Sequence, residues 1–211
     1  MKLTLYLIRH GLSCCNILHH KDLRLNAINV MHKDPLLAHR GVDQSKRAGA
    51  FIQNKMPEVD LVFSSALFRA IETAHHMFPG RTINVCPYIC EKRPSLENFP
   101  YHPRNQLRRI KTHIKDLEQI KFPSHSNGIS GSDFKKFIEY MLENFTVKNK
   151  CIAVVTHSNF LVDILKLKER MNNNAVFRVI VDTDTFAVEK IECLFSGYTF
   201  PEHASLQMAI R

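Results

Sequence analysis

The sequence has no apolar run approaching the roughly 20 residues that an α-helix needs to span a bilayer. Its start, Met1-Lys2-Leu3, leads directly into a strand-like segment, without the apolar region and cleavage site of a secretory signal peptide. The six cysteines form no Cys-x-x-Cys pair, and several lie in apolar strand-like segments, as reduced core cysteines do. These absences predict a cytoplasmic protein without a membrane span.

Several classes of enzyme are excluded because their motifs are missing. The sequence contains no Walker loop and no dinucleotide-binding glycine motif. A cysteine-based phosphatase needs an arginine six residues after its cysteine, and none of these cysteines has one. The pairs His19-His20 and His75-His76 point apart on a helix or strand, and no cysteine–histidine set has zinc-finger spacing. We therefore expect no metal and no cofactor.

The composition is that of one ordinary globular domain. The 211 residues are 45% hydrophobic and 23% charged, which suffices for a sizeable core. Lys and Arg number 29 against 20 acidic residues, for a net charge of +9. This excess favours an anionic partner, whether nucleic acid, a membrane surface or a phosphorylated substrate.

Short apolar runs alternate along the chain with segments of helical periodicity. Strands are predicted over residues 5–8, 59–63, 82–85, 152–155, 176–181 and 186–191. Helices are predicted over about 42–55, 67–78 and 132–146, the last with Ser132 as its N-cap, and directly after residue 158. The alternation predicts an α/β fold with a mainly parallel sheet and helices on both faces.

Residues 91–131 interrupt this alternation and contain four prolines. Leu107, Ile110, Ile114 and Leu117 predict one amphipathic helix, and residues 99–115 hold five basic residues and no acidic one. We interpret about 92–131 as a basic helical insertion, or cap, over the C-terminal edge of the sheet within a single domain of residues 1–211. Its charge is either a solvated helix face or a means of steering the substrate. Nucleic-acid binding is disfavoured because aromatic residues for base stacking are few.

Polar residues follow several of the predicted strands. They are Arg9 and His10, Ser64 with Arg69, Glu91, and His157. Because the carboxyl ends of parallel strands meet at one edge of a sheet, where α/β proteins bind ligands, we expect these side chains to converge.

Together these residue types can cleave a phosphate ester. A neutral imidazole can attack phosphorus and split hydrolysis into two easier steps through a phospho-enzyme. Two arginines can clamp the phosphoryl oxygens, and a second histidine adds a donor. A carboxylic acid can protonate the leaving alkoxide. The residues available for these roles are Arg9, His10, Arg69, Glu91 and His157.

Three stretches resemble motifs of the histidine phosphatase superfamily, the two-histidine phosphatases and phosphoglycerate mutases. They are Arg9-His10-Gly11-x-Ser13-x-x-Asn16, the segment 64–74, and Val154-Val-Thr-His157. Leu37-x-x-x-Gly41 and residues 173–191 are also similar to family segments, and only about 92–131 lack a counterpart. The resemblance implies a phosphoglycerate-mutase-like fold.

The resemblance also implies roles for individual residues. His10 is implied to be the nucleophile, and Glu91 matches the family's proton donor, although Glu97 is a nearby alternative. Phosphate binding is assigned to Arg9, Arg69 and His157, supported by Asn16, Ser13 and Ser158. Asn16 is either a phosphate ligand or a helix cap. The alternative for Arg69 is a purely structural salt bridge with Glu72, one helical turn further on. Departures from the family pattern occur at Leu12, Ala38 and Ser158, and none removes a catalytic group.

The sequence therefore predicts a metal-independent phosphatase that hydrolyses phosphate monoesters through a phosphohistidine on His10. One alternative is a phosphoglycerate-mutase-type phosphotransferase, which the short insertion disfavours because the family's mutases resemble longer chains. Another is a non-catalytic phosphoanion-binding scaffold. The phosphorylated substrate, whether a small molecule or a phosphoprotein, and the oligomeric state are left open.

Overall fold

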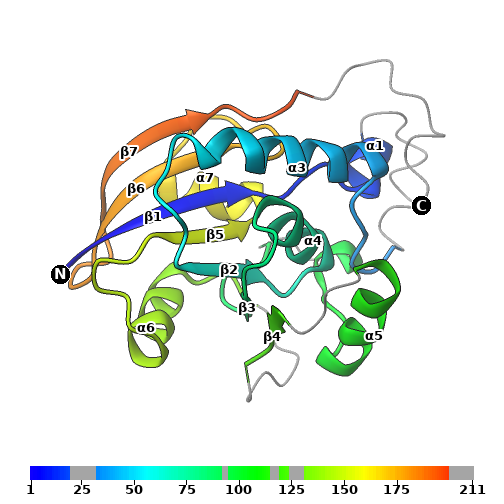
Figure 1. The fold of residues 1–211 in the computed structure, drawn as a ribbon, viewed down its shortest axis with the longest axis horizontal. Helices are drawn as coiled ribbons and strands as arrows, with labels where there is room; N and C mark the ends of the chain where they lie inside the picture. The colour runs from blue at the N-terminus through cyan, green and yellow to red at the C-terminus, as the bar shows by residue number, and fades with distance from the viewer. Residues whose placement is uncertain (20–31, 92–94, 115–118, 124–130, 200–211) are drawn as a thin grey trace.

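The structure is a computed structural model that describes residues 1–19, 32–91, 95–114, 119–123 and 131–199 (Figure 1). In this part of the chain, seven strands form one sheet in the order β4-β3-β2-β5-β1-β6-β7. Strands β1 to β5 are mutually parallel, whereas β6 and β7 are antiparallel to their neighbours. The strands are β1 (Lys2–Arg9), β2 (Leu61–Ser65), β3 (Ile83–Cys86), β4 (Ile120–Lys121), β5 (Ile152–Thr156), β6 (Val176–Asp182) and β7 (Val188–Phe195).

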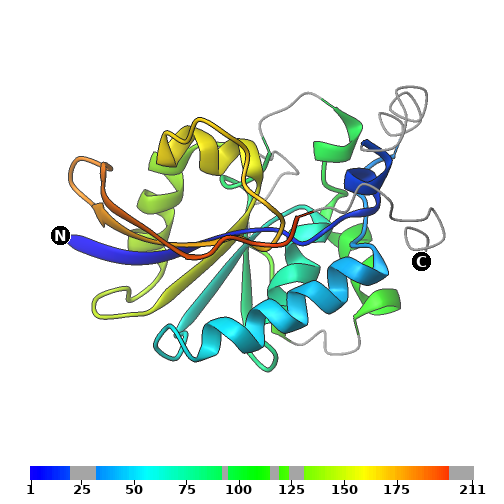
Figure 2. The same ribbon diagram turned by 90° about the horizontal axis from the view of Figure 1, so that it is seen from above.

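Helices cover both faces of the sheet, as Figure 2 shows. Helices α3 and α4 pack on one face, and α6 and α7 pack on the other. The described helices are α1 (Cys14–His19), α3 (His39–Gln53), α4 (Phe68–Met77), the 3-10 helix η1 (Leu96–Asn98), α5 (Pro103–His113), α6 (Phe134–Asn144) and α7 (Ser158–Leu165). None of them is both long and apolar enough to cross a membrane. The predicted mainly parallel α/β fold is confirmed.

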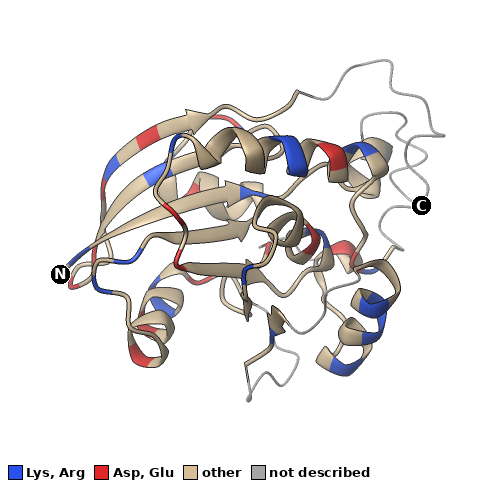
Figure 3. Ribbon diagram, viewed as in Figure 1, with Lys and Arg blue, Asp and Glu red and all other residues tan. Residues whose placement is uncertain are grey.

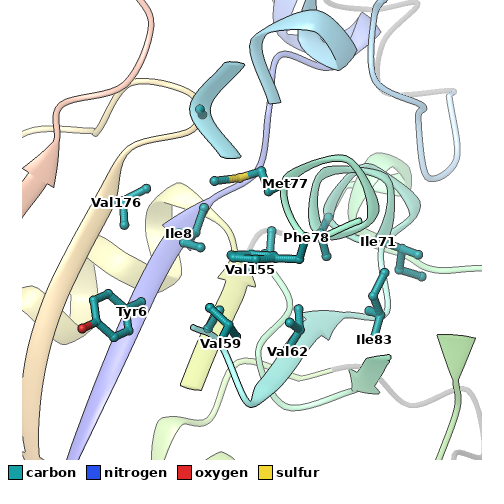
Figure 4. Close-up of a cluster of buried hydrophobic side chains, with 14 of the residues drawn as sticks. Tyr6, Ile8, Val59, Val62, Ile71, Met77, Phe78, Ile83, Val155 and Val176 are labelled. Atoms are coloured by element: carbon teal, nitrogen blue, oxygen red, sulfur yellow. The ribbon is translucent and has the colours of Figure 1, made fainter. Parts of the chain in front are cut away.

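Strand β1 lies near the middle of the sheet and is buried on both faces. Tyr6 and Ile8 enter the core under α3 and α4, where Ile8 lies near Met77 and Val155 (Figure 4). Leu5 and Leu7 enter the opposite core under α6 and α7. Because successive strand residues point to opposite faces, an uninterrupted apolar run is what such a strand requires.

Two details differ from the sequence-based expectation. The N-cap of α6 is Asp133 and not Ser132, because the Asp133 carboxylate accepts a hydrogen bond from the Lys136 amide at 3.0 Å. Strand β4, which pairs with β3, was not predicted because two residues are too few to show a period.

The helix predicted within 92–131 is α5, which ends at His113, and Leu117 lies outside the described residues. Ile110 and Ile114 of this segment are buried in the core beside α4. The carboxylate of Asp34 links α5 to α4. It accepts a hydrogen bond from Gln106 Nε2 of α5 at 2.5 Å and another from the Phe68 amide of α4 at 2.7 Å. The outer face of α5 carries lysine and arginine and no acidic residue (Figure 3).

Candidate active site

His10 and His157 lie side by side because the strands that precede them are neighbours. Strands β1 and β5 are parallel, and Arg9 pairs with Thr156. The next residue of each strand is therefore a histidine at the same edge. The His10 amide donates to the Thr156 carbonyl at 2.9 Å, and the two imidazole ring centres are 5.0 Å apart.

The protonation state of His10 follows from its contacts. Its Nδ1 lies 2.7 Å from the Gly11 carbonyl oxygen, which only accepts, so Nδ1 carries the proton. Its Nε2 then holds a lone pair and lies 3.4 Å from Nε of Arg69. Burial, together with the charges of Arg69 and Arg9, lowers the pKa of His10 well below its usual range. The imidazole is therefore neutral and able to attack at neutral pH.

His157 is oriented by Ser65, at the end of β2. The Ser65 hydroxyl lies 2.6 Å from His157 Nε2 and accepts from the Leu67 amide, so its own hydrogen can be donated to Nε2. When Ser65 donates in this way, the proton of a neutral His157 ring lies on Nδ1. Burial lowers the pKa of His157 well below its usual range, with help from Arg69, so the ring is neutral. In this tautomer, Nδ1–H of His157 can donate a hydrogen bond.

Arg69 reaches the site from the first turn of α4. Its Nη1 donates to the Glu97 carbonyl and its Nη2 donates to Asn98 Oδ1, both at 2.7 Å. Glu72, suggested as an alternative partner, accepts from the Leu37 amide at 2.6 Å. The guanidinium is therefore held between η1 and the imidazole of His10.

Arg9 is the second arginine of the site, and its side chain is partly buried. Its Nη1 donates to the Met171 carbonyl. Burial lowers the pKa of Arg9 to about 10, a shift that Glu91 opposes and that Arg170 and Arg69 reinforce. The group stays charged at neutral pH.

A pocket of about 650 Å³ opens over these residues. The predicted site residues that line it are Arg9, His10, Ser13, Asn16, Arg69, Glu91 and Ser158, and Glu97 lines it as well. His157 contacts the ring of His10 just behind this lining. The structure thus brings together the residues proposed for catalysis and phosphate binding, whereas Ser64, which was also expected at this edge, does not line the pocket.

Three buried polar atoms of this site have no hydrogen-bond partner in the described part of the chain. They are Nε of Arg9, Nδ1 of His157 and Oγ of Ser158. A buried donor without a partner costs about 1–3 kcal/mol. Such a cost at three unpartnered polar atoms of one site favours a site that binds an oxyanion.

Ser13 and Asn16 form the start of α1. The Asn16 amide donates to Ser13 Oγ and the Ser13 amide donates to Asn16 Oδ1, both at 3.2 Å. Asn16 Oδ1 also accepts from Asn173 Nδ2 at 3.2 Å. Asn16 therefore caps the helix while its side chain lines the pocket, so the two roles considered for it are compatible.

Sequence reasoning missed three polar residues that complete the site, namely Asn98, Arg170 and Asn173. Asn173 Nδ2 donates to the His10 carbonyl at 3.0 Å and so helps to hold the main chain of His10 in place. Its one signal in the sequence was its place at the start of the segment 173–191, which resembles the family. No three His, Cys, Asp or Glu residues in the described ranges are arranged to hold a metal ion.

Comparison with known proteins identifies the family. The sequence model of the histidine phosphatase superfamily (branch 1) matches residues 5–200. A comparison with curated protein sequences finds no match.

Solved structures with the same fold include the ecdysone phosphate phosphatase EPPase from Bombyx mori in complex with tungstate. It has a TM-score of 0.59 and 13% identity, and the alignment covers 99% of this chain and 100% of that one. A putative alpha-ribazole-5'-P phosphatase from Escherichia coli has a TM-score of 0.54 and 16% identity, and the alignment covers 91% of this chain and 95% of that one. Phosphoserine phosphatase from Entamoeba histolytica, in complex with 3-phosphoglyceric acid, has a TM-score of 0.51 and 18% identity. That alignment covers 93% of this chain and 98% of the other. With a family match over nearly its whole length, this chain belongs to the histidine phosphatase superfamily.

Proposed function

We propose that the chain is a metal-independent phosphatase that hydrolyses phosphate monoesters through a phosphohistidine on His10. The observation that carries this proposal is the state of the His10 ring, whose Nδ1–H is held by the Gly11 carbonyl and whose Nε2 is unprotonated at the pocket. The chain's own side chains can supply the nucleophile, the cations and the acid. The phosphatases among the similar structures support a phosphate monoester as the substrate.

In the first step, Nε2 of His10 attacks phosphorus, and the new P–N bond forms as the ester P–O bond breaks. Arg9 and Arg69 bind the phosphoryl oxygens, and Nδ1–H of His157 donates to one of them. A protonated Glu91 gives its proton to the leaving oxygen. In the second step, the Glu91 carboxylate takes a proton from a water molecule. The water oxygen attacks phosphorus, and the P–N bond to His10 breaks.

In this proposal, residues 1–211 form one catalytic domain and about 92–131 cap its site. The support for a cap is the contact between η1 and Arg69. Glu97 and Asn98 of η1 line the pocket, and both accept hydrogen bonds from Arg69.

The direct test is to trap the intermediate. The chain is mixed, in EDTA, with a ³²P-labelled aryl phosphate at pH 5–8, and phosphate release and protein-bound label are measured. We expect turnover, and a label that survives alkali and is lost in acid, as a P–N bond is. Label that passes to an added alcohol faster than to water would instead indicate a phosphotransferase. Absence of both label and turnover, with phosphate still bound, would favour the scaffold.

Glu91→Gln is expected to lower kcat for an alkyl phosphate by about 10²-fold or more, because general acids contribute about 10²–10⁴-fold. The same variant should hydrolyse p-nitrophenyl phosphate at close to the normal rate, because p-nitrophenolate leaves without a proton. The measurement is kcat for both esters in each variant.

Glu97→Gln is the matched control, since Glu97 lines the same pocket and its carbonyl holds Arg69. It should affect both esters alike and only weakly. Selective loss of the alkyl phosphate in Glu97→Gln would transfer the proton-donor role to Glu97.

A further inference from the structure

The pocket is much larger than a phosphoryl group. Its lining includes the buried His10 and Arg69 and the partly buried Arg9, and His157 lies beside His10. Arg170 also lines the pocket, and its side chain is exposed. Its guanidinium makes no hydrogen bond or ion pair with any residue in the described ranges. It is therefore a cation whose binding capacity the fold does not use.

The placement of this third arginine is electrostatically unfavourable for the protein alone. Arg170 lies close enough to Arg9 for its charge to disfavour the charged form of Arg9. A phosphoryl group carries about two negative charges, which Arg9 and Arg69 can already match. Arg170 is thus surplus to a ligand that has only the phosphoryl group.

Arg170 shares its pocket with the proposed acid. Glu91 and Arg170 both line the pocket, and both lie close enough to Arg9 to act on its charge. The leaving group must reach Glu91 to be protonated. Its substituents therefore enter the pocket that Arg170 lines.

The remaining lining of the pocket is mostly polar. It includes Asn159, Asn172 and Thr199, with Met171 and Tyr198 as the larger apolar surfaces. Amides and hydroxyls of this kind suit a leaving group that carries oxygen or nitrogen. An extended apolar leaving group would leave them unpaired, which costs free energy.

We propose that the substrate is a small, polar phosphate monoester whose leaving group bears a second anionic group, and that Arg170 binds this second group. The proposal rests on the phosphatase function proposed above. A carboxylate and a second phosphate offer the same paired anionic oxygens to a guanidinium.

The test uses substrates that differ only in the second anion. For the carboxylate, 3-phosphoglycerate is compared with glycerol 1-phosphate, and for the phosphate, fructose 1,6-bisphosphate is compared with fructose 6-phosphate. We expect kcat/KM to favour the member with the second anion in at least one pair by about 10-fold or more, the effect of one charge-assisted hydrogen bond. Arg170→Gln should reduce that preference to about twofold or less, because kcat/KM falls more for the member with the second anion than for the member without it. The pair that responds identifies the anion.

Lys168→Gln is the matched control, because Lys168 is exposed on the same loop, carries the same charge and does not line the pocket. The proposal is overturned if Arg170→Gln lowers kcat/KM equally for both members of each pair, or if Lys168→Gln has the same selective effect. Arg170→Lys should retain part of the preference.

Binding separates this proposal from the catalytic one. The affinities of 3-phosphoglycerate and glycerol 1-phosphate for His10→Ala, by calorimetry, require no turnover. Selective weakening of 3-phosphoglycerate by Arg170→Gln in that background would support the anion site even if no phospho-enzyme formed. The proposal would be overturned if, in the His10→Ala protein with and without Arg170→Gln, 3-phosphoglycerate and glycerol 1-phosphate bound with equal affinity and the two fructose phosphates did as well.

Discussion

His10→Ala is expected to abolish the acid-labile label and to lower kcat by about 10⁴-fold or more, the scale of loss seen when a covalent nucleophile is removed. The neighbouring His157 is not placed to attack through Nε2, because the Ser65 hydroxyl contacts that atom at 2.6 Å. The cations of the pocket remain, so binding of inorganic phosphate should persist. The measurements are single-turnover kinetics, label incorporation and phosphate calorimetry on the same preparation.

The control for this prediction is His39→Ala, since His39 is exposed at the start of α3 and lies outside the pocket. It should retain full activity. If His10→Ala kept a label while His157→Ala lost it, the nucleophile would be His157, and the assignment from ring contacts would be wrong.

The parallel sheet is why the centre of the site could be predicted from sequence. Arg9-His10 and Thr156-His157 end two apolar runs, and parallel strands place such ends at one edge. Arg69 follows because a helix that starts right after β2 begins at that edge too. These predictions needed only the order and period of the elements.

The choice between Ser64 and Ser65 shows where this reasoning stops. The sequence analysis singled out Ser64, yet Ser65 contacts His157 and the Ser64 hydroxyl donates to the Ser65 carbonyl. Neighbouring strand residues point to opposite faces, so an uncertainty of one residue in where a strand ends exchanges their roles. Helical and strand periods do not fix that end.

Asn98, Arg170 and Asn173 could not be predicted for a different reason. Arg170 and Asn173 lie on the connection between α7 and β6, and Asn98 ends the three-residue helix η1. In such segments no period relates sequence to direction. The buried Asp34 likewise joins α5 to α4, although Phe68 lies 34 residues and Gln106 lies 72 residues further along the chain. Such contacts depend on how the connections pack once the sheet has formed.

Gly41→Ala is expected to have the largest effect on stability, because the third residue of α3 packs directly against the loop that follows His10. A Cβ at position 41 would lie 2.0 Å from the Leu12 carbonyl oxygen and 2.9 Å from the Leu12 carbonyl carbon, and main chain cannot rotate away as a side chain can. Overpacking of this kind costs about 1–3 kcal/mol or more. At about 3 kcal/mol, the melting temperature should fall by about 6–12 °C.

The same substitution should impair the folded enzyme, because displacing Leu12 shifts Gly11, whose carbonyl orients His10. Small misplacements of a reacting group cost up to about 10²-fold, so kcat is expected to fall by about 10-fold or more below the melting transition. Gly131→Ala is the matched control: a Cβ there meets nothing within 4 Å, so both Tm and kcat should stay near normal. A Gly41→Ala protein with unchanged Tm would show that α3 can move away from Leu12. It would also show that α3 does not hold the loop that follows His10 in place.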